Sequence, residues 1–529
     1  MGRVVEGHPD AGRPAAGLRG AGPAWAPPDD LMSRVLGVLV VVSLAVPTMA
    51  CAQSVPPASA LTRFPWEAAP HENGARALPL ELRSAFRSAW TDDRDNGALW
   101  AGKGLSALVR GGVTYRRGPL RLAVMPELIW SSNGAFPLAD GLWSGDTRLS
   151  GPWVPDLPRR WGKGSTTQLH PGQSFIEARW ADFAVGMTSQ SQSRGPEVRY
   201  PIILGTSAPG VPTGFVEGSV GLGPLGQTHL RAQWGVLHES PFFDNNPDND
   251  RLLLSTFFAD WTPAGGSGLR VGASYTYRDP LDAGFAPSML VRAFSTTSAQ
   301  DALRRAGDGI AAVHVAWMSN PLGVWGTWGR GDYWLNTEDF ITEPDYSQIW
   351  TGGLAVHWPQ AGAGWRLVSE AASVTGNTTS RYNPIAYRHS VATQGYTHRG
   401  QMLGASIGPG AQGAWLLLER TDSARTLGVE VERILRDLDA YNAVFFRPDG
   451  SSGEDREWRF GLLYEGPIPR FDLPGVSVKA NGGLSLRWNR DYIQYSSNAH
   501  LVGPRESQIF LDLALTWDPW HARRQGSQD

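Results

Sequence analysis

Polar and apolar residues alternate with a period of two along most of the chain from about residue 104 onward. The clearest run covers 476–488, whose even positions are Val476, Val478, Ala480, Gly482, Leu484, Leu486 and Trp488. Runs at 120–130, 269–278 and 509–517 follow the same rule and carry aromatic residues toward their ends. Successive side chains of a β-strand point to opposite faces, so these runs predict strands with one apolar face. A run of 13 residues is longer than most strands of soluble proteins and indicates a strand that crosses a membrane.

The connections between these strands alternate in length. Short ones fall near 117–118, 181, 223–226, 263–267, 320–321 and 359–363, and long ones at 131–172, 190–212, 239–250, 279–308, 331–347 and 375–398. A transmembrane barrel has short periplasmic turns and long outer loops, whereas a soluble sandwich does not require this alternation. We therefore predict an all-β, outer-membrane β-barrel over 101–518 with an even number of about 16–18 strands, followed by a tail at 519–529.

The alternation fails in two places. A strand that the pattern does not reveal must precede 104–116, because that strand has to run toward the periplasm. Two short turns, at 409–412 and 422–424, follow each other within 399–434. We therefore expect one strand to be missing from our assignment and one to be false.

Residues 53–100 are predicted to form a short N-terminal periplasmic helical segment. In 78–90, Leu82, Ala85, Phe86 and Ala89 have the i, i+3, i+4, i+7 spacing of one helical stripe. The alternative is a loop that happens to contain helix-forming residues.

The start of the chain predicts export. A short positive region at Met32–Arg34, a 12-residue apolar region from Val35 to Val46 and the small-residue site Ala50-Cys51-Ala52 form a secretory signal peptide over 32–52. Gln53 is then the mature N-terminus, and 1–31 is an upstream start-site extension. In the alternative, Cys51 ends a lipobox and is lipidated, although Thr48 is not the apolar residue that a lipobox has three positions before its cysteine.

Composition excludes several classes of protein. The single cysteine allows no intramolecular disulfide and no cysteine-based metal cluster. A net charge of -3 gives no reason to expect a nucleic-acid partner. The mean hydropathy of -0.26 is too low for a bundle of membrane helices.

Few motifs of enzyme chemistry occur in the sequence. H-E-x-x-H is absent, and Gly205-Thr206-Ser207-Ala208-Pro209 fails G-x-S-x-G at its last position, although the short glycine-rich stretch 404–408 matches that pattern. The oxygen-rich loop 244–250 suits Ca²⁺ by composition, but it lacks EF-hand spacing and the closing glutamate, so its composition favours an ordinary turn-rich loop. We expect no catalytic site, cofactor or metal, although outer-membrane hydrolases assemble their sites from distant strands and stay an alternative.

One long loop, 331–347, combines aromatic and acidic residues in a way that suits sugar binding. Aromatic faces stack on sugar rings and carboxylates accept hydrogen bonds from hydroxyls. The candidate glycan-binding residues are Tyr333, Trp334, Asp339, Glu343, Asp345 and Tyr346. In the alternative, the aromatic residues of 331–347 lie at the membrane interface and its acidic residues are ordinary loop residues. The long loop 435–455 has a similar mixture of residues.

Charged residues also recur on the predicted inward face of the barrel. They are Glu177, Arg179, Arg231, Arg270, Arg278, Glu430, Glu432 and Arg487. Such residues indicate a lumen that is either hydrated or crossed by salt bridges.

Three stretches resemble the Wzi-type capsule assembly family. They are Asp339-Phe340-Ile341-Thr342-Glu343-Pro344-Asp345-Tyr346-Ser347 with the strand after it, Gly395-Tyr396-Thr397-His398-Arg399-Gly400 with Leu403 to Gly408, and Gly195-Pro196 through Tyr200 to Pro209. The resemblance implies a barrel of about eighteen strands that binds capsular or exopolysaccharide at the cell surface, with surface polysaccharide and outer-membrane lipid as partners. It implies no enzymatic site. A general or substrate-selective porin is the main alternative.

Overall fold

The computed structural model describes residues 73–519, except for 93, 139–154, 244–245, 247–248, 282–283, 293–306, 332–340, 342–346, 361, 376–385, 390–391, 443–452, 470, 472 and 493–504. Twenty strand segments form one antiparallel sheet. Both β3 and β4 pair with β2, so β3 and β4 together form one interrupted strand. On its other side, β3 pairs with β6 and β4 pairs with β5, so β5 and β6 form a second interrupted strand. The twenty segments therefore make a closed barrel of 18 strands, the upper end of the predicted range.

The strands are β1 (Gly74–Arg87), β2 (Gly104–Arg117), β3 (Leu120–Val124), β4 (Glu127–Ser131), β5 (Thr166–His170), β6 (Phe175–Trp180), β7 (Phe183–Thr188), β8 (Thr213–Gly221), β9 (Gln227–His238), β10 (Arg251–Thr262), β11 (Leu269–Pro280), β12 (Asp308–Ser319), β13 (Leu322–Arg330), β14 (Gln348–Gln360), β15 (Ala363–Ser373), β18 (Gln412–Asp422), β19 (Thr426–Arg436), β20 (Asp455–Gly466), β21 (Val476–Trp488) and β22 (Arg505–Trp517). A separate hairpin pairs β16 (Thr397–His398) with β17 (Gln401–Met402). Short helical turns are η3 (Gly223–Leu225), α2 (Met289–Arg292), α5 (Leu438–Ala440) and η5 (Arg490–Tyr492). None of the helices among the described residues has the length and apolar character needed to cross a membrane.

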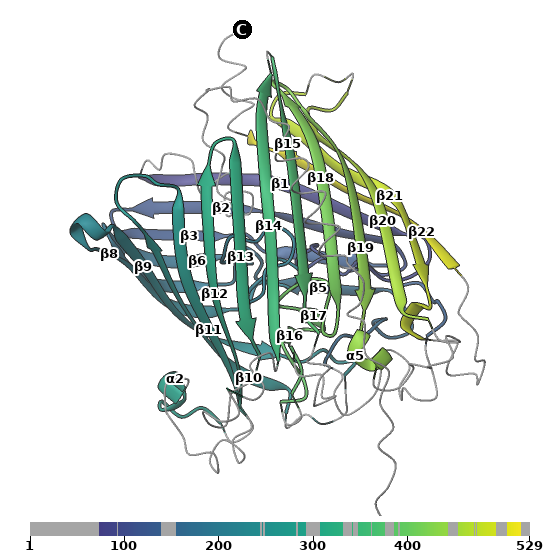
Figure 1. The fold of residues 1–529 in the computed structure, drawn as a ribbon, viewed down its shortest axis with the longest axis horizontal. Helices are drawn as coiled ribbons and strands as arrows, with labels where there is room; N and C mark the ends of the chain where they lie inside the picture. Colours follow the sequence, from purple (N-terminus) through teal and green to yellow (C-terminus); the bar gives the residue numbers. More distant parts are fainter. Residues whose placement is uncertain are drawn as a thin grey trace, which may run out of the picture. The chain divides into compact units, whose positions relative to one another are not determined.

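The barrel closes between its first and last strands. β1 pairs with β22 along a continuous antiparallel register that includes Leu82↔Leu515 and Phe86↔Leu511. Strands β12 to β15 run steeply in the foreground of Figure 1, and β1 to β3 cross behind them. Closure leaves no free sheet edge, as a barrel in lipid requires.

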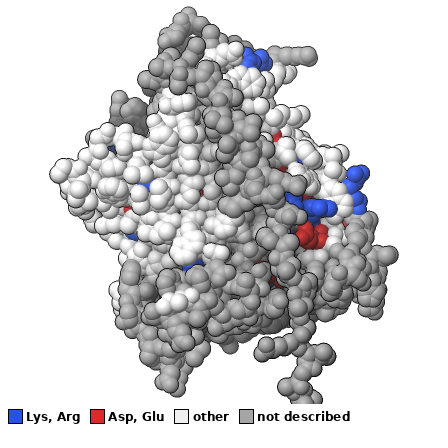
Figure 2. All heavy atoms as spheres, viewed as in Figure 1, with Lys and Arg blue, Asp and Glu red and all other residues white. Residues whose placement is uncertain are grey.

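Side chains alternate between an apolar outer face and a polar inner face. On β21, Leu484 is exposed while Ser485 and Arg487 are buried, and on β22 Ile509 and Leu511 are exposed while Gln508 is buried. Charged side chains are sparse on the described part of the face that Figure 2 shows. The exposed leucine, valine and aromatic side chains therefore form the lipid-facing band of a membrane barrel.

Short and long connections alternate without exception, and this confirms the prediction from the sequence. The short ones are 118–119, 181–182, 222–226, 263–268, 320–321, 361–362, 423–425 and 467–475, and the long ones are 88–103, 132–165, 189–212, 239–250, 281–307, 331–347, 374–411, 437–454 and 489–504. Because the strands are antiparallel, all long connections lie at one end of the barrel. The turns α2 and α5, which belong to two of them, lie at the lower edge of Figure 1.

The predicted helix at 78–90 is wrong, because most of it belongs to β1. Leu80, Leu82 and Phe86 are exposed on the outer face, and the side chain of Arg87 is buried on the inner face. Ala85 points inward and is apolar because it packs against Ala98 and Leu99 of the connection 88–103. This inward apolar residue disguises the period of two and creates the helical spacing. β1 is also the strand that had to precede 104–116.

The loss of phase at 399–434 also has a structural cause. The connection 374–411 contains the β16–β17 hairpin, and the barrel resumes only at Gln412. The turn predicted at 409–412 therefore ends a long connection and does not join two barrel strands.

Candidate functional site

The lumen is filled by chain from the long-connection end. The connections 189–212 and 374–411 contribute Tyr200, Ile202, Tyr387, Tyr396 and Leu403 to one buried apolar cluster. Inward-facing strand residues complete that cluster: Leu254, Phe258, Ile310, Trp325, Ile349, Val368 and Trp415. The Tyr387 hydroxyl donates to the Ile202 carbonyl at 2.7 Å, so the two connections are bonded to each other. Together they form a plug, by which we mean the described parts of 189–212 and 374–411.

One carboxylate in the barrel wall holds the plug. Glu370, on β15, accepts hydrogen bonds from the backbone N–H groups of Val198, Arg199 and Tyr200, at 2.8, 2.9 and 2.6 Å. The indole of Trp325, on β13, donates to the same carboxylate at 2.9 Å. Successive N–H groups converging on one anion form a nest, and charge-assisted hydrogen bonds are the stronger kind. The wall and the plug are therefore joined at a fixed point.

A second set of contacts joins the connection 88–103 to the barrel wall through Arg94. Its guanidinium donates to Asp92 at 2.7 Å, to Glu432 of β19 at 3.2 Å and to Glu457 of β20 at 3.1 Å. Arg459 of β20 also donates to Asp92, at 2.7 Å. Burial alone would raise the pKa of Asp92, but Arg94 and Arg459 outweigh it and hold that pKa well below its usual range. The connection 88–103 is thus tied to the barrel wall at β19 and β20 by ionised groups.

Most of the charged residues predicted to face inward form ion pairs with other charged side chains. Arg179 pairs with Glu177, Arg231 with Glu217, Arg270 with Asp260, Arg278 with Asp308, and Arg487 with Asp455. Glu432 receives Arg94 and Arg199, and Glu430 accepts from Trp415 and Asn481. Of the two possibilities left open by the sequence, the salt-bridged lumen is therefore the one that the described residues form.

A polar pocket of about 100 Å³ lies where the plug meets the long-connection end. It is lined by parts of the connections 88–103, 132–165, 189–212 and 374–411, by the ends of β19 and β21, and by η5. Five arginines and three aspartates line it: Arg94, Arg159, Arg388, Arg436 and Arg487, with Asp92, Asp437 and Asp491. Pockets for drug-sized ligands are about 300–1,000 Å³, so this one suits a single substituent or the end of a chain.

The aspartates of the pocket are already neutralised. Arg388 donates to Asp437 at 2.6 Å, and Arg487 donates to Asp491 at 2.9 Å. Burial opposes ionisation of Asp491, but Arg487 and Arg159 outweigh it and lower the pKa of that residue. A carboxyl group held in its ionised form by arginine is poorly placed to act as a general acid.

Several polar atoms that line the pocket have no hydrogen-bond partner among the described residues. They are Oγ1 of Thr91, Nε of Arg159, Nε of Arg388 and Oγ of Ser406, and the last two belong to buried residues. Buried polar groups are almost always hydrogen-bonded in native proteins. Their convergence on one pocket marks it as a candidate site for a polar ligand group or water.

Aromatic side chains complete the pocket. Trp90 and Phe136 line it, and the guanidinium carbon of Arg490 lies 5.9 Å from the Trp90 ring centroid and 5.5 Å from that of Phe136. Trp90 is buried, whereas Phe136 is partly exposed. A few directed polar groups beside aromatic faces are the usual composition of a small-molecule site.

The six predicted glycan-binding residues, Tyr333, Trp334, Asp339, Glu343, Asp345 and Tyr346, lie outside the described residues. The strands that flank them end at Arg330 and begin at Gln348, which places their connection at the long-connection end. The other predicted loop, 435–455, supplies Arg436 and Asp437 to the pocket. The oxygen-rich loop 244–250 is only partly described, and no His, Cys, Asp and Glu group able to hold a metal occurs among the described residues.

The pocket residues were not predicted as a binding site, apart from those in 435–455, and Arg487 was predicted only to face the lumen. One signal was nevertheless present: Ser406, Ile407 and Gly408 belong to a stretch that resembles the Wzi-type family, and all three line the pocket. Trp90, Arg159 and Arg388 belong to different connections and carry no common pattern.

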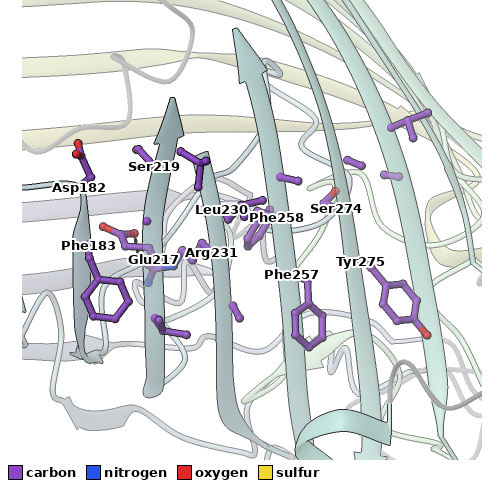
Figure 3. Close-up of a pocket in the computed structure, with 18 of the residues that line it drawn as sticks. Asp182, Phe183, Glu217, Ser219, Leu230, Arg231, Phe257, Phe258, Ser274 and Tyr275 are labelled. Carbon is purple, nitrogen blue, oxygen red and sulfur yellow. Dashed lines mark hydrogen bonds and ion pairs between the residues drawn. The ribbon is translucent and has the colours of Figure 1, made fainter. Parts of the chain in front are cut away.

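A larger concavity of about 860 Å³ lies on the outer face of the barrel, over β7 to β12 (Figure 3). Among its lining residues, Phe183, Leu230 and Val313 are exposed to the surroundings of the barrel. Glu217 and Arg231 border it, but they pair with each other at 2.6 Å. This groove has the character of a lipid-facing surface and does not gather free polar groups. The pocket in the lumen is the candidate functional site.

The fold is similar to that of known outer-membrane barrels. The structure of Wzi, a carbohydrate-binding β-barrel involved in group 1 capsule assembly in Escherichia coli, aligns with a TM-score of 0.52 at 10% identity, over 83% of this chain and 84% of that chain. Pseudomonas aeruginosa OccK7 aligns with a TM-score of 0.38 at 10% identity, over 84% and 98%. The outer-membrane channel DcaP of Acinetobacter baumannii aligns with a TM-score of 0.33 at 9% identity, over 84% and 96%.

No known family model matches the chain, and no curated protein does. At these identities the similarity establishes the fold. The chain has the fold of an outer-membrane β-barrel.

Proposed function

We propose that this protein sits in the outer membrane and binds or retains a surface polysaccharide, as part of capsule or exopolysaccharide assembly. The observation that carries the proposal is the filled lumen with a polar, aromatic-edged pocket at its long-connection end. The resemblance of 195–209, 339–347 and 395–408 to the Wzi-type family, and the similarity to the carbohydrate-binding barrel Wzi, point the same way.

The plug favours binding over transport. Tyr200, Tyr387 and Tyr396 are at most 1% exposed, and they pack against the inner wall. A general porin keeps a water-filled channel, whereas this lumen holds an apolar cluster and paired charges. A substrate-selective porin, the alternative, would require the plug to move.

We place the long connections outside the cell and the short turns in the periplasm, with export directed by the signal peptide at 32–52. In that orientation the pocket faces the exterior. The loop 331–347 then offers Trp334 and Tyr346 as stacking surfaces, and Asp339, Glu343 and Asp345 as hydrogen-bond acceptors for the same glycan. Lipid acyl chains cover the outer face, including the groove of Figure 3.

We propose binding and not catalysis, because each aspartate of the pocket is paired with arginine. A hydrolase would need an unpaired carboxylate pair or an activated nucleophile. Turnover screens with lipid, peptide and glycan substrates test that alternative.

The decisive experiment compares current with glycan capture. The folded full-length protein should pass little current in planar bilayers and should retain surface polysaccharide in a pull-down. Deletion of the gene should release polysaccharide from the cells. Large, stable conductance without glycan retention would establish the porin instead.

A further inference from the structure

We infer that the lumen pocket receives a carboxylate group of an acidic sugar. This inference rests on the proposed function and names the chemical class of the glycan. It follows from which polar atoms of the pocket are free and which are already used.

The free atoms are mainly hydrogen-bond donors. Nε of Arg388 can only donate, and the hydroxyls of Thr91 and Ser406 can donate. The missing partner is therefore an acceptor. A carboxylate accepts through two oxygens and has no proton to place, so it satisfies several donors at once.

The arginines of the pocket outnumber the carboxylates that are free to balance them. Asp491 is shared among Arg159, Arg487 and Arg490, at 3.3, 2.9 and 3.4 Å. The Asp491 contact of Arg159 is made by Nε without a hydrogen bond, and the side chain of Arg159 is about one-third exposed. Arg159 is therefore available to an anion that enters from the exterior.

Other charges of the pocket do not compete for the anion. Arg436 is held by Glu457 at 2.6 Å, and Arg487 is held by Asp455. Asp437 accepts a hydrogen bond from one nitrogen of Arg388, Nη2, whereas Nε has no hydrogen-bond partner in the described part of the chain. The cations left for a ligand are thus Arg388 at the inner side and Arg159 at the partly exposed side.

Size agrees with this assignment. A volume of about 100 Å³ admits a carboxyl group with part of its ring, but not an oligosaccharide. The ring that bears the carboxylate would then lie against the partly exposed Phe136 at the pocket edge. The rest of the glycan chain would continue outward over the long connections.

The test uses the full-length protein in detergent and the surface polysaccharide of the cells that make it. The probe is prepared in two forms, native and carboxyl-reduced, in which each uronate becomes a neutral sugar. We expect the native form to bind about 10- to 100-fold more tightly, the range that one or two charge-assisted hydrogen bonds provide. R388Q and R159Q should each remove most of this preference, whereas Arg420→Gln, at an exposed position near a short turn, should keep it.

The outcomes separate the two proposals. Equal binding of both forms, or a native polysaccharide without carboxylates that still binds, overturns the carboxylate inference and leaves glycan binding intact. Failure of the parent protein to bind either form overturns the proposed function itself. If R388Q does not fold, R159Q gives the answer, because Arg159 is partly exposed and has Asp491 as its ion-pair partner.

Discussion

The backbone N–H of Tyr200 donates a 2.6 Å hydrogen bond to the carboxylate of Glu370, and this contact joins the plug to the barrel wall. The two residues are 170 positions apart in the chain. Val198 and Arg199 bring two further N–H groups to the same carboxylate. One acid on β15 therefore fixes the position of a connection that begins after β7.

Replacing that acid should loosen the plug. Glu370→Ala leaves three buried or partly buried N–H groups and an indole N–H without their acceptor, and each unsatisfied buried group costs about 1–3 kcal/mol. We expect the temperature of the heat-modifiable gel shift to fall and the bilayer current to rise. Glu465→Gln, in an exposed ion pair with Lys479, is the matched control and should change stability by less than about 0.5 kcal/mol. An unchanged current in Glu370→Ala would mean that the plug is held elsewhere.

A neighbouring acid of the plug should make stability depend on pH. Burial raises the pKa of Glu197 to about 8, above its value in an unfolded chain. Between pH of about 4.5 and 8 the folded state holds one more proton at this site than the unfolded state does. Its contribution to stability is therefore complete at low pH and is lost as pH rises through this window, by up to about 1.4 kcal/mol per pH unit.

Glu197→Gln isolates this effect, because glutamine resembles the protonated acid. The variant should match the parent near pH 5 and should unfold at a higher temperature than the parent above pH 8. Circular dichroism melts at pH 5, 6.5 and 8.5 provide the measurement. Parallel curves for parent and variant at all three values would refute the assignment.

The contacts of Arg94 should contribute to the stability of the barrel. Arg94→Met leaves Asp92, Glu432 and Glu457 without this cation, and breaking a buried pair typically costs about 3–5 kcal/mol. Combining it with Glu457→Gln should recover part of the loss, because one uncompensated charge is removed. The strand ladder does not involve this side chain, so both variants should still show strand signals by circular dichroism. A stability of Arg94→Met equal to that of the parent would contradict the prediction.

Glycan binding should also depend on the loop 331–347. Losing an aromatic anchor typically costs about 2 kcal/mol, and a hydrogen bond to a charged group is worth roughly 1.5–3 kcal/mol. Trp334→Ala combined with Asp339→Asn should therefore weaken polysaccharide binding by about two orders of magnitude, with little change in barrel stability. If the double variant retains polysaccharide like the parent, the contacts lie instead around 435–455.

The orientation in the membrane can be tested with introduced cysteines. Phe285→Cys lies in an exposed part of a long connection, and Ala424→Cys lies in a short turn. A membrane-impermeant thiol reagent should label the first on intact cells and the second only after the outer membrane is opened. We expect the natural cysteine, Cys51, to be removed with the predicted signal peptide at 32–52. The reverse labelling pattern would place the pocket on the periplasmic side.

The barrel was predictable because it repeats two simple signals. Alternation along 476–488 and the succession of short and long connections arise from the pleat of a strand and from the two sides of a membrane. Both are local, so they survive in a single sequence. β1 was not predicted because Ala85 faces inward and packs against the connection 88–103. The sequence pattern of β1 does not reveal this contact.

The pocket was not predictable for a related reason. Its residues come from connections that are hundreds of positions apart, and the position of each is set by the plug and not by its own neighbours in sequence. Arginine and aspartate in a loop ordinarily indicate a solvated surface. Their burial inside the lumen follows only once the barrel has closed around them.

The seam between β1 and β22 has a consequence for biogenesis. Trp90, just after β1, donates its backbone N–H to Gln508 of β22, and these residues are 418 positions apart. Contacts of such high contact order form late and slowly. The barrel can therefore close only after β22 has been synthesised and has paired with β1. The connections that fill the lumen must enter it before this closure. Removing β22 should produce no stable truncated barrel, but an open sheet that quality-control proteases recognise during assembly.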